Sequence, residues 1–331
     1  MARRAVLLNQ GEIRIDEYEA RFDSSSDCVV KVLATVVCST DVRAFNGRKT
    51  RLDLDNPPVL GHEICGRIQY SGTSGIPTGE KVSVIGSKFC RKCEYCKNGQ
   101  PLLCQQFKIS CGGFSDTLVI PPEWVEWRLV HLDRDADVVA AAYLDSISCM
   151  VRAMRIATIK KGQRILVLGD GFMSQVLAKI IHLNDVEVFL MQETESFESS
   201  FSDTKYSILS VKEIFRKDEI KFDIIFDFGQ YEKNKHDLTG LLAFGGKYVA
   251  LSHRGSVVLH DLSLIYKNRY EFLHSYHSDL VDRECAKAYL PKLSTDLNKL
   301  SSAFPLDNTQ DALEAVSKGN AIRCHINFSA L

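Results

Sequence analysis

Hydrophobic and polar positions predict a buried strand early in the chain and alternating strands and helices after about residue 160. Residues 29–37 (VVKVLATVV) are mostly β-branched and apolar, which is typical of a buried strand. Residues 165–168 (ILVL) predict another buried strand, and a helical pattern follows at 175–181. This alternation favours a parallel, doubly wound sheet. The remaining predicted elements are strands at 186–191, 222–227 and 246–251, a helix at 311–316 and a strand at 322–328.

Composition and charge narrow the class of protein. The chain has 331 residues, of which 45% are hydrophobic and 25% charged, as in a soluble globular protein with room for two cores. The net charge is −1 and no stripe of lysine or arginine is visible, so we expect no nucleic-acid partner. Residues 1–10 resemble neither a signal peptide nor an anchor, and we expect no membrane span. Eleven cysteines without a paired framework favour reduced thiols and a cytoplasmic protein.

Four cysteines stand close together in a short polar stretch and predict a zinc site. Their spacing is C-x2-C-x2-C-x7-C, at Cys90, Cys93, Cys96 and Cys104. Four thiolates can form one tetrahedral Zn²⁺ cage without strain, and a site with all four positions filled is structural. A disulfide pair or a chance cluster is the alternative. A zinc with all four positions filled has no place for a substrate, so the residues that carry out a reaction are expected elsewhere in the chain.

Four further residues carry polar chemistry near this strand at 29–37. Cys38 and Thr40 follow it directly, and a His62-Glu63 pair stands between Gly61 and Gly66. Taken singly, Cys38 is equally a small buried hydrophobe, His62 a hydrogen-bonded core histidine and Glu63 a surface carboxylate.

The combination of motifs is more specific than any one of them. It comprises, in order, Cys38 with Thr40, Gly61-His62-Glu63, Gly79-Glu80-Lys81-Val82, the four-cysteine block and Gly112-Gly113-Phe114. In this order the chain resembles the zinc-dependent medium-chain dehydrogenase/reductase superfamily, the relatives of alcohol, polyol and threonine dehydrogenases. The resemblance implies an α/β protein with a GroES-like β-rich catalytic domain and a Rossmann cofactor domain. The implied bounds are 1–144 for the catalytic domain, 89–105 for its structural zinc lobe, 145–277 for the cofactor domain and 278–331 for a C-terminal return into the catalytic domain.

The resemblance also implies a second, catalytic zinc held by Cys38 and His62. Its third ligand is expected at Asp145, where relatives carry cysteine or glutamate, or else at Glu63. An ordinary helix N-cap is the alternative role for Asp145. Thr40 is expected to begin a proton relay, but Arg43 stands where relatives often have the next relay histidine. The expected metal content is thus two Zn²⁺ per chain, one structural and one catalytic.

A glycine turn after the strand at 165–168 predicts a dinucleotide site. Residues 169–174 read Gly169-Asp170-Gly171-Phe172-Met173-Ser174, with serine in place of the usual third glycine. The glycines permit a tight turn and bring the backbone and a helix N-terminus to a pyrophosphate, with Phe172 and Met173 beginning that helix.

The choice of cofactor follows from the next strand and its loop. Gln192, with Glu193 adjacent, stands about 20 residues on, where a carboxylate usually binds the ribose. The loop at 194–203 is acidic and has no cation before Lys205, so we expect NAD over NADP. By resemblance Arg323 reaches the pyrophosphate; a surface arginine at a strand edge is the alternative.

These expectations together predict an oxidoreductase. It would transfer a hydride between NAD and a secondary alcohol such as a polyol, a sugar derivative or a similar polar alcohol, with a small-molecule alcohol or ketone as its partner. A threonine-dehydrogenase-like enzyme acting on a 3-hydroxy amino acid is one alternative. A dinucleotide-binding protein with an eroded site is another. By analogy with the family we expect a homodimer or homotetramer.

Overall fold

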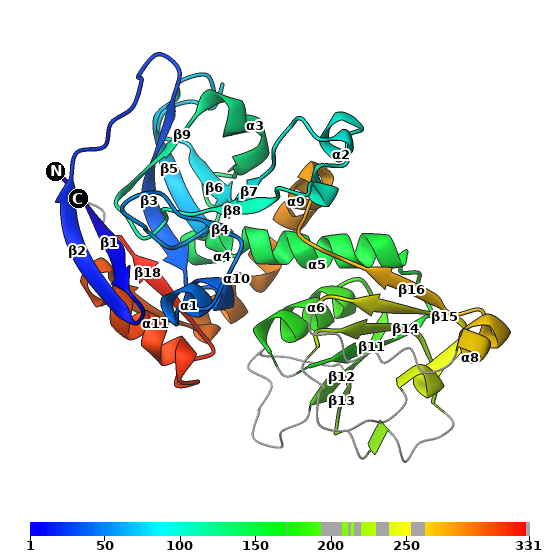
Figure 1. Ribbon diagram of the computed structural model, residues 1–331. Helices are drawn as coiled ribbons and strands as arrows, with labels where there is room; N and C mark the ends of the chain where they lie inside the picture. Colours follow the sequence, from blue (N-terminus) through cyan, green and yellow to red (C-terminus); the bar gives the residue numbers. More distant parts are fainter. Residues whose placement is uncertain are drawn as a thin grey trace. The chain divides into compact units, whose positions relative to one another are not determined.

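The chain folds into two compact units, each described by itself. The structure is a computed structural model that describes residues 1–169, 171–192, 207–210, 213–214, 220–229, 238–252 and 262–328. Unit 1 combines Met1–Ser146 with Ser278–Leu331, and unit 2 is Ile147–His277 (Figure 1). Helix α5 (Leu144–Ala157) begins in unit 1 and continues into unit 2.

Unit 1 is built on β-sheet. Its main sheet has the strand order β10-β6-β5-β3-β18-β17, with β9 also paired to β3. The hairpin β1-β2 and the small sheet β4-β8-β7 complete it. The strand bounds are β1 (Ala2–Asn9), β2 (Glu12–Tyr18), β3 (Cys28–Val36), β4 (Leu52–Asp53), β5 (Glu63–Tyr70), β6 (Lys81–Ile85), β7 (Ser87–Lys88), β8 (Lys108–Ser110), β9 (Thr117–Ile120), β10 (Leu129–His131), β17 (Ser301–Pro305) and β18 (Arg323–Asn327).

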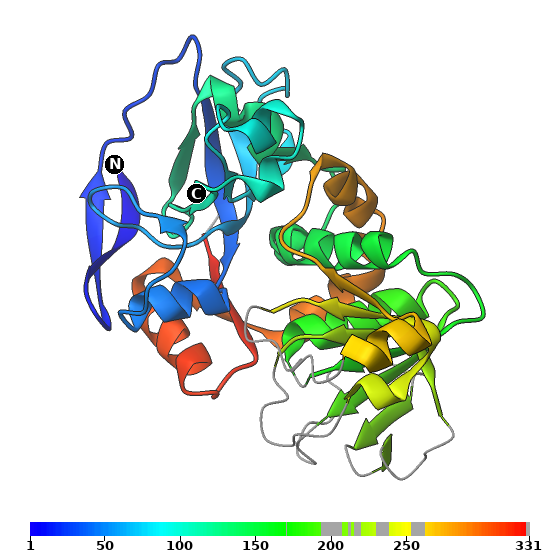
Figure 2. The same ribbon diagram turned by 45° about the vertical axis from the view of Figure 1, so that its right-hand side comes forward.

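Strand β3 lies at the centre of this sheet, which confirms the strand expected at 29–37. It pairs antiparallel with β5, β9 and β18, so chain segments far apart in sequence meet on it. Figures 1 and 2 show the C-terminal strand β18 in red running beside β3 in blue. Val30, Val32 and Ile64 are almost fully buried in the core that this sheet covers. A β-branched, nearly continuous apolar run suits a strand with both faces covered.

The helices of unit 1 are short, and the last three belong to the C-terminal segment. Their bounds are α1 (Ser39–Phe45), α2 (Glu94–Lys97), α3 (Val125–Arg128), α4 (Val138–Ala142), α9 (Leu280–Lys287), α10 (Leu290–Leu300) and α11 (Thr309–Ser317). Single 3₁₀ turns lie at Pro101–Leu103, Pro122–Trp124 and Leu306–Asn308. The predicted helix at 311–316 and strand at 322–328 are confirmed as α11 and β18.

A buried arginine ties the C-terminal segment to the rest of unit 1. Arg283 of α9 is 1% exposed. Its guanidinium donates to Ser87 Oγ at 2.9 Å, to Ser278 O at 3.1 Å and to the carbonyl of Trp127. Because a buried charge needs such partners, these bonds fix where the chain re-enters the unit.

Unit 2 contains the predicted doubly wound sheet. Its strand order is β13-β12-β11-β14-β15-β16, and every pairing is parallel (Figure 1). Helix α6 packs on β11 and β12. This order reverses direction between β11 and β14, the place where such sheets bind dinucleotides. The bounds are β11 (Arg164–Leu168), α6 (Phe172–His182), β12 (Glu187–Gln192), β13 (Ser207–Ser210), β14 (Phe222–Asp227), a 3₁₀ turn (Leu238–Leu241), β15 (Leu242–Ala250), α8 (Leu262–Asn268) and β16 (Glu271–His274).

The strands predicted for this unit lie close to the observed ones, with one exception. The strand expected at 246–251 begins earlier, at Leu242. Leu242 pairs with Phe222 before a register irregularity, and Gly245 has φ of 72°. Two adjacent glycines therefore interrupt the ladder without ending the strand.

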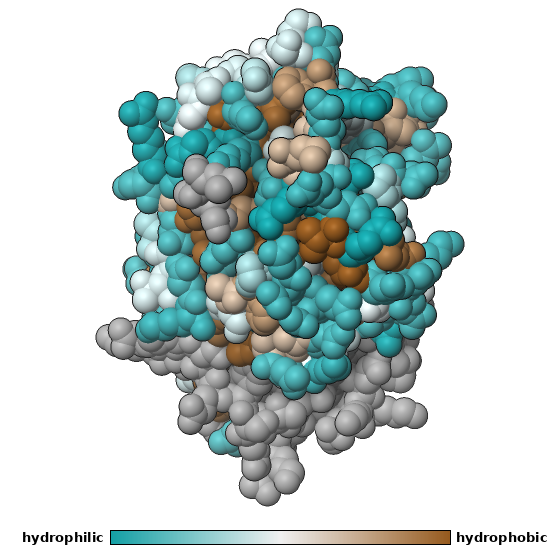
Figure 3. Space-filling model, turned by 90° about the vertical axis from the view of Figure 1, so that its left-hand side faces the viewer, coloured by the Kyte–Doolittle hydropathy of each residue, from teal (hydrophilic) through white to brown (hydrophobic). Residues whose placement is uncertain are grey.

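The surface of the described residues is mostly polar on the face seen in Figure 3, where apolar residues form small groups between hydrophilic ones. Among the helices in the described ranges, none is long and apolar enough to cross a bilayer.

A buried chain of hydroxyls in unit 1 ends on a histidine. The Tyr143 hydroxyl donates to Ser301 Oγ at 2.9 Å, and Ser301 Oγ lies 2.8 Å from His325 Nδ1. All three residues are at most 6% exposed. Since Ser301 accepts from Tyr143, its own hydrogen is available for Nδ1, which suits a neutral imidazole. Burial lowers the pKa of His325, although the charge of Asp137 opposes that shift.

This arrangement predicts loss of stability in acid. A histidine with a lowered pKa in the folded state binds fewer protons than in the unfolded state, so its contribution is complete above pH 6.5 and is lost as the pH falls below that value. The free energy of unfolding should fall with a slope of up to about 1.4 kcal/mol per pH unit from this group. Urea unfolding of wild type and His325→Asn between pH 5 and 7.5 measures it. If the free energy of unfolding changes with pH equally in the two proteins, His325 does not cause the loss of stability in acid.

Candidate functional site

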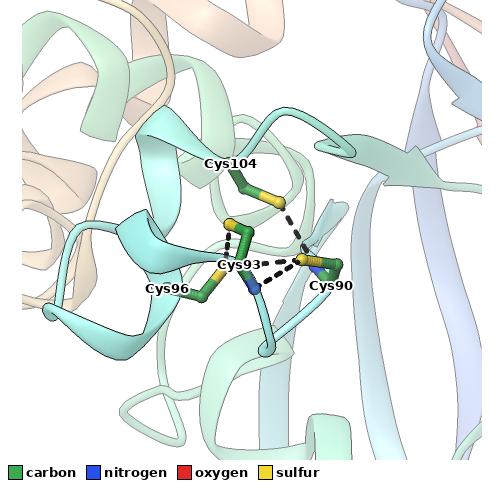
Figure 4. A group of neighbouring side chains, drawn as sticks. All are labelled: Cys90, Cys93, Cys96 and Cys104. Carbon is green, nitrogen blue, oxygen red and sulfur yellow. Dashed lines mark hydrogen bonds between the residues drawn. The ribbon is translucent and has the colours of Figure 1, made fainter.

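The four cysteines of the block converge on one centre. Figure 4 shows their side chains pointing toward one another in the loop that carries α2. Cys93 Sγ lies 3.5 Å from Cys96 Sγ, and Cys90 Sγ lies 4.0 Å from Cys96 Sγ. A tetrahedral Zn²⁺ with bonds of about 2.3 Å places its sulfurs about 3.8 Å apart. These separations therefore fit one zinc and are too long for disulfides.

Backbone geometry prepares the sulfurs for a metal. The amide of Cys93 donates to Cys90 Sγ, and the amide of Cys90 donates to Cys104 Sγ, both at 3.3 Å. Backbone amides of Lys92 and Cys93 lower the pKa of the Cys90 thiol to about 6. The thiolate is the metal-binding form, so these amides favour it at Cys90, whereas burial and the neighbouring thiols raise the pKa of Cys96 to about 12.

The lobe rests on an aromatic cluster. The ring of Phe89 meets Trp124 and Trp127 edge to face, at centroid distances of 5.5 Å and 4.7 Å. Arg91, with φ of 61°, lies over the Trp124 ring at 4.5 Å. The two tryptophans therefore pack under the cysteine loop.

A second group of metal-binding residues lies at the end of β3 and the start of β5. Ligand atoms of Cys38, His62 and Glu63 lie within 4.8 Å of one another, and this part of the chain is closely packed. Gly61 is required just before His62: its φ is +89°, and a Cβ there would lie 2.9 Å from the Phe114 amide nitrogen. Glycine thus allows β5 to begin where the imidazole faces Cys38.

Asp41 organises this second group. It is fully buried in the first turn of α1, and its carboxylate accepts the Cys38 amide at 3.2 Å and the Gly61 amide at 3.0 Å. Its Oδ1 lies 3.2 Å from His62 Nδ1. A carboxylate on Nδ1 fixes the imidazole with Nε2 free to bind a metal, as in many metal-binding histidines.

The charges of the group are coupled. Burial by itself lowers the pKa of His62, but the charges of Asp41 and Cys38 outweigh it and raise that pKa well above its ordinary value. Burial by itself raises the pKa of Cys38, but His62 and Arg323 outweigh it and lower the pKa to about 6. Burial, with the charge of Cys38, raises the pKa of Glu63 to about 8.

A buried oxygen of Glu63 indicates that the group of Cys38, His62 and Glu63 can bind a cation. Glu63 is 3% exposed, and its Oε2 has no hydrogen-bond partner among the described residues. A buried carboxylate oxygen without a partner is costly, and a bound metal ion would supply the missing contact. Cysteine, histidine and glutamate together form a donor set that suits Zn²⁺.

Asp145 lies beside this group rather than within it. It is the second residue of α5, whose first residue is Leu144, so the alternative role as N-cap is wrong. Burial and the charge of Glu63 raise the pKa of Asp145 to about 6, while the Gly86 amide, which donates to it, lowers that pKa. The metal-binding groups found among the described residues do not include Asp145.

Arg323 and Thr40 border the same group. Arg323 is 6% exposed, so the alternative of a surface arginine is wrong. Its Nη1 donates to Val37 O at 3.1 Å, and the charges of Glu63 and Cys38 raise its pKa although burial opposes them. Thr40 lies partly exposed in the first turn of α1, two residues from Cys38. Contact of Arg323 with a pyrophosphate stays a prediction.

The glycine turn of unit 2 has the expected strand and helix around it. Gly169 follows β11 with φ of 138°, and Gly171 is the N-cap of α6. Phe172 and Met173 begin that helix, Phe172 buried and Met173 partly exposed. The hydroxyl of Ser174 lies 2.8 Å from Gly169 O and 2.6 Å from Gly171 O. Serine at the third glycine position thus fits the turn, and its hydroxyl stabilises the turn by hydrogen bonding to its backbone carbonyls.

Two predicted cofactor residues fall at the limit of the described chain. Gln192 is the last residue of β12, and its backbone pairs with Ser210 of β13. Glu193 and the acidic loop at 194–203 lie outside the described residues, as does Asp170.

Comparison with known proteins shows similarity to dehydrogenases. The model of the alcohol dehydrogenase GroES-like domain matches residues 24–129. A probable D-xylulose reductase A of Neosartorya fischeri is 22% identical over 320 residues, covering 90% of this chain and 88% of that protein. The solved alcohol dehydrogenase of Thermotoga maritima superposes with a TM-score of 0.86 at 19% identity, covering 98% of this chain and 99% of that one. Residues 24–129 thus match an alcohol dehydrogenase GroES-like domain, and over nearly its whole length the chain has the fold of a solved alcohol dehydrogenase.

Similarity to a second dehydrogenase is confined to part of the chain. The L-galactonate-5-dehydrogenase of Escherichia coli strain K12 is 30% identical over 159 residues, which cover 46% of this chain and 45% of that protein. For that relative the alignment therefore spans less than half of its length.

Three residues of the site were not assigned a role from the sequence. Asp41 holds His62, Ser146 donates to Glu63 Oε1 at 2.9 Å, and Cys111 lies with Asp41 and His62 in a second close group. A carboxylate three residues after Cys38 was a visible sign of a capping box. Ser146 and Cys111 gave no such signal, because their partners are remote in sequence.

Proposed function

We propose that the chain is a zinc-dependent oxidoreductase that transfers a hydride between a polar secondary alcohol and NAD. The convergence of Cys38, His62 and Glu63 on one point, with a buried carboxylate oxygen left unpartnered, carries this proposal. The glycine turn between β11 and α6 supports the dinucleotide part. The relatives named for L-galactonate and D-xylulose support a polyhydroxylated substrate.

The chain's own residues would prepare the reaction. Cys38, His62 and Glu63 would hold the catalytic zinc, and Cys90, Cys93, Cys96 and Cys104 the structural one. When bound, the catalytic zinc would polarise a substrate hydroxyl, and the nicotinamide would accept the hydride. Asp41 keeps His62 in the metal-binding tautomer.

Proton transfer and cofactor binding would fall to other residues. Thr40 would bond the substrate oxygen and pass on its proton, which requires a hydroxyl within reach of the metal-binding group. In unit 2, Gly169, Gly171 and the start of α6 would receive the pyrophosphate. The absence of cations in the sequence at 194–203 supports NAD over NADP.

A substrate panel tests the proposed function. Initial rates of cofactor reduction would be measured with polyols, sugar acids and L-threonine, each with NAD and with NADP, and with the Cys38→Ala variant as the blank. We expect turnover of at least one polyhydroxylated alcohol with NAD. Turnover of L-threonine alone would favour the 3-hydroxy amino acid reading. No cofactor reduction in any combination would contradict the proposal.

A further inference from the structure

The hydroxyl of Ser146 holds one side of Glu63. Ser146 Oγ donates to Glu63 Oε1 at 2.9 Å, and the two residues are 5% and 3% exposed. They are 83 positions apart in the sequence, on α5 and β5. Because a hydroxyl has one hydrogen, this bond commits that hydrogen to Glu63, while Oε2 keeps no partner within the described part of the chain.

Glu63 needs this restraint because a competing charge is near. Burial and the charge of Cys38 raise the pKa of Glu63 to about 8, while the charge of Arg323 opposes that shift. Burial opposes the rise in the pKa of Arg323, to which the charge of Glu63 contributes. A glutamate side chain has several rotamers, and an ion pair with arginine is a strong alternative to metal binding. A hydrogen bond on Oε1 opposes rotation toward that alternative.

We infer that Ser146 is a positioning residue that fixes Glu63 as the third ligand of the catalytic metal. The inference rests on the proposed function, since it requires a metal at Cys38 and His62. It assigns Asp145 a place outside the ligand set, consistent with the Gly86 amide already donating to that carboxylate. Groups that orient a ligand typically contribute about 10- to 100-fold to metal affinity.

Cobalt binding tests this role without using catalysis. Protein with zinc in the four-cysteine site and no metal at Cys38 is titrated with Co²⁺, and the visible absorption of the bound ion gives Kd. We expect Ser146→Ala to raise this Kd by about 10-fold or more, and Ser146→Thr to restore it because the hydroxyl returns. Ser83→Ala is the matched control, since Ser83 is a fully buried serine in β6 whose hydroxyl has no partner among the described residues.

The possible outcomes distinguish a failure of the role of Ser146 from a failure of the proposed function. One Co²⁺ per chain bound by wild type, with equal Kd in Ser146→Ala, overturns the role of Ser146 and leaves the proposed function standing. A weakening as large in Ser83→Ala also overturns it, because the effect would then be a general loss of a buried hydroxyl. A wild-type chain that takes up no Co²⁺ while zinc fills the cysteine block overturns the proposed function, and the role of Ser146 with it.

Discussion

Replacing Cys38 with alanine is expected to lower kcat/KM for alcohol oxidation by at least about 1000-fold, because a metal acting as Lewis acid supplies several kcal/mol of transition-state stabilisation. Cys38 is the cysteine of the metal-binding group that also contains His62 and Glu63, and it is the N-cap of α1. Alanine leaves His62 and Glu63 as the only two ligands of that group. Two ligands do not hold a catalytic zinc, which uses three.

Cofactor binding should be spared by the same change. The substitution leaves unchanged the residues expected to receive the pyrophosphate, Gly169, Gly171 and the start of α6, so the dissociation constant of NADH, followed by its fluorescence, should stay within about twofold of wild type. Cys65→Ala is the matched control, since Cys65 is a fully buried thiol in β5 that belongs to neither metal group. Wild-type turnover in Cys38→Ala would refute the catalytic metal.

Replacing Cys96 with alanine is expected to unfold the cysteine lobe. The apolar cluster beside the block is small, comprising Phe89, Cys104, Phe107 and Ile109. A structural zinc in such a setting contributes roughly 10 kcal/mol of binding free energy to folding. Losing even about 3 kcal/mol of it should lower Tm by roughly 6–12 °C in a unit of this size.

Thermal unfolding and limited proteolysis measure the effect on the lobe. The variant should be cleaved within residues 89–105 under conditions that leave wild type intact, since unfolded loops are the preferred sites of cleavage. Cys285→Ala, at an exposed cysteine of α9, is the control and should behave as wild type. An unchanged Tm and cleavage pattern in Cys96→Ala would show that the four sulfurs hold no structural metal.

The parts of the fold that the sequence predicted are those set by local pattern. The buried strand at 29–37, the strand and helix around Gly169, and the spacing of the four cysteines are all contained within short segments, and periodicity or ligand spacing reveals them. The convergence of Cys38 with His62 was expected only from family resemblance. Pattern alone left each residue with an ordinary structural role.

The remaining features depend on contacts between distant segments. Ser146 meets Glu63 across 83 positions, and Arg323 becomes buried because β18 inserts beside β3. Asp145 was expected as a zinc ligand, and a helix cap stayed open as the alternative because the start of α5 at Leu144 is not marked by any capping residue in the sequence. Such pairings follow from tertiary packing, which a single sequence does not display.

The zinc content of purified wild type and Cys38→Ala, determined by elemental analysis after exchange into metal-free buffer, tests the catalytic metal site most directly. Two zinc ions per chain in wild type and one in Cys38→Ala are expected, because only the second group loses a ligand. One zinc per chain in both proteins would mean that only the cysteine block is occupied, and it would favour a dinucleotide-binding protein without zinc-dependent catalysis.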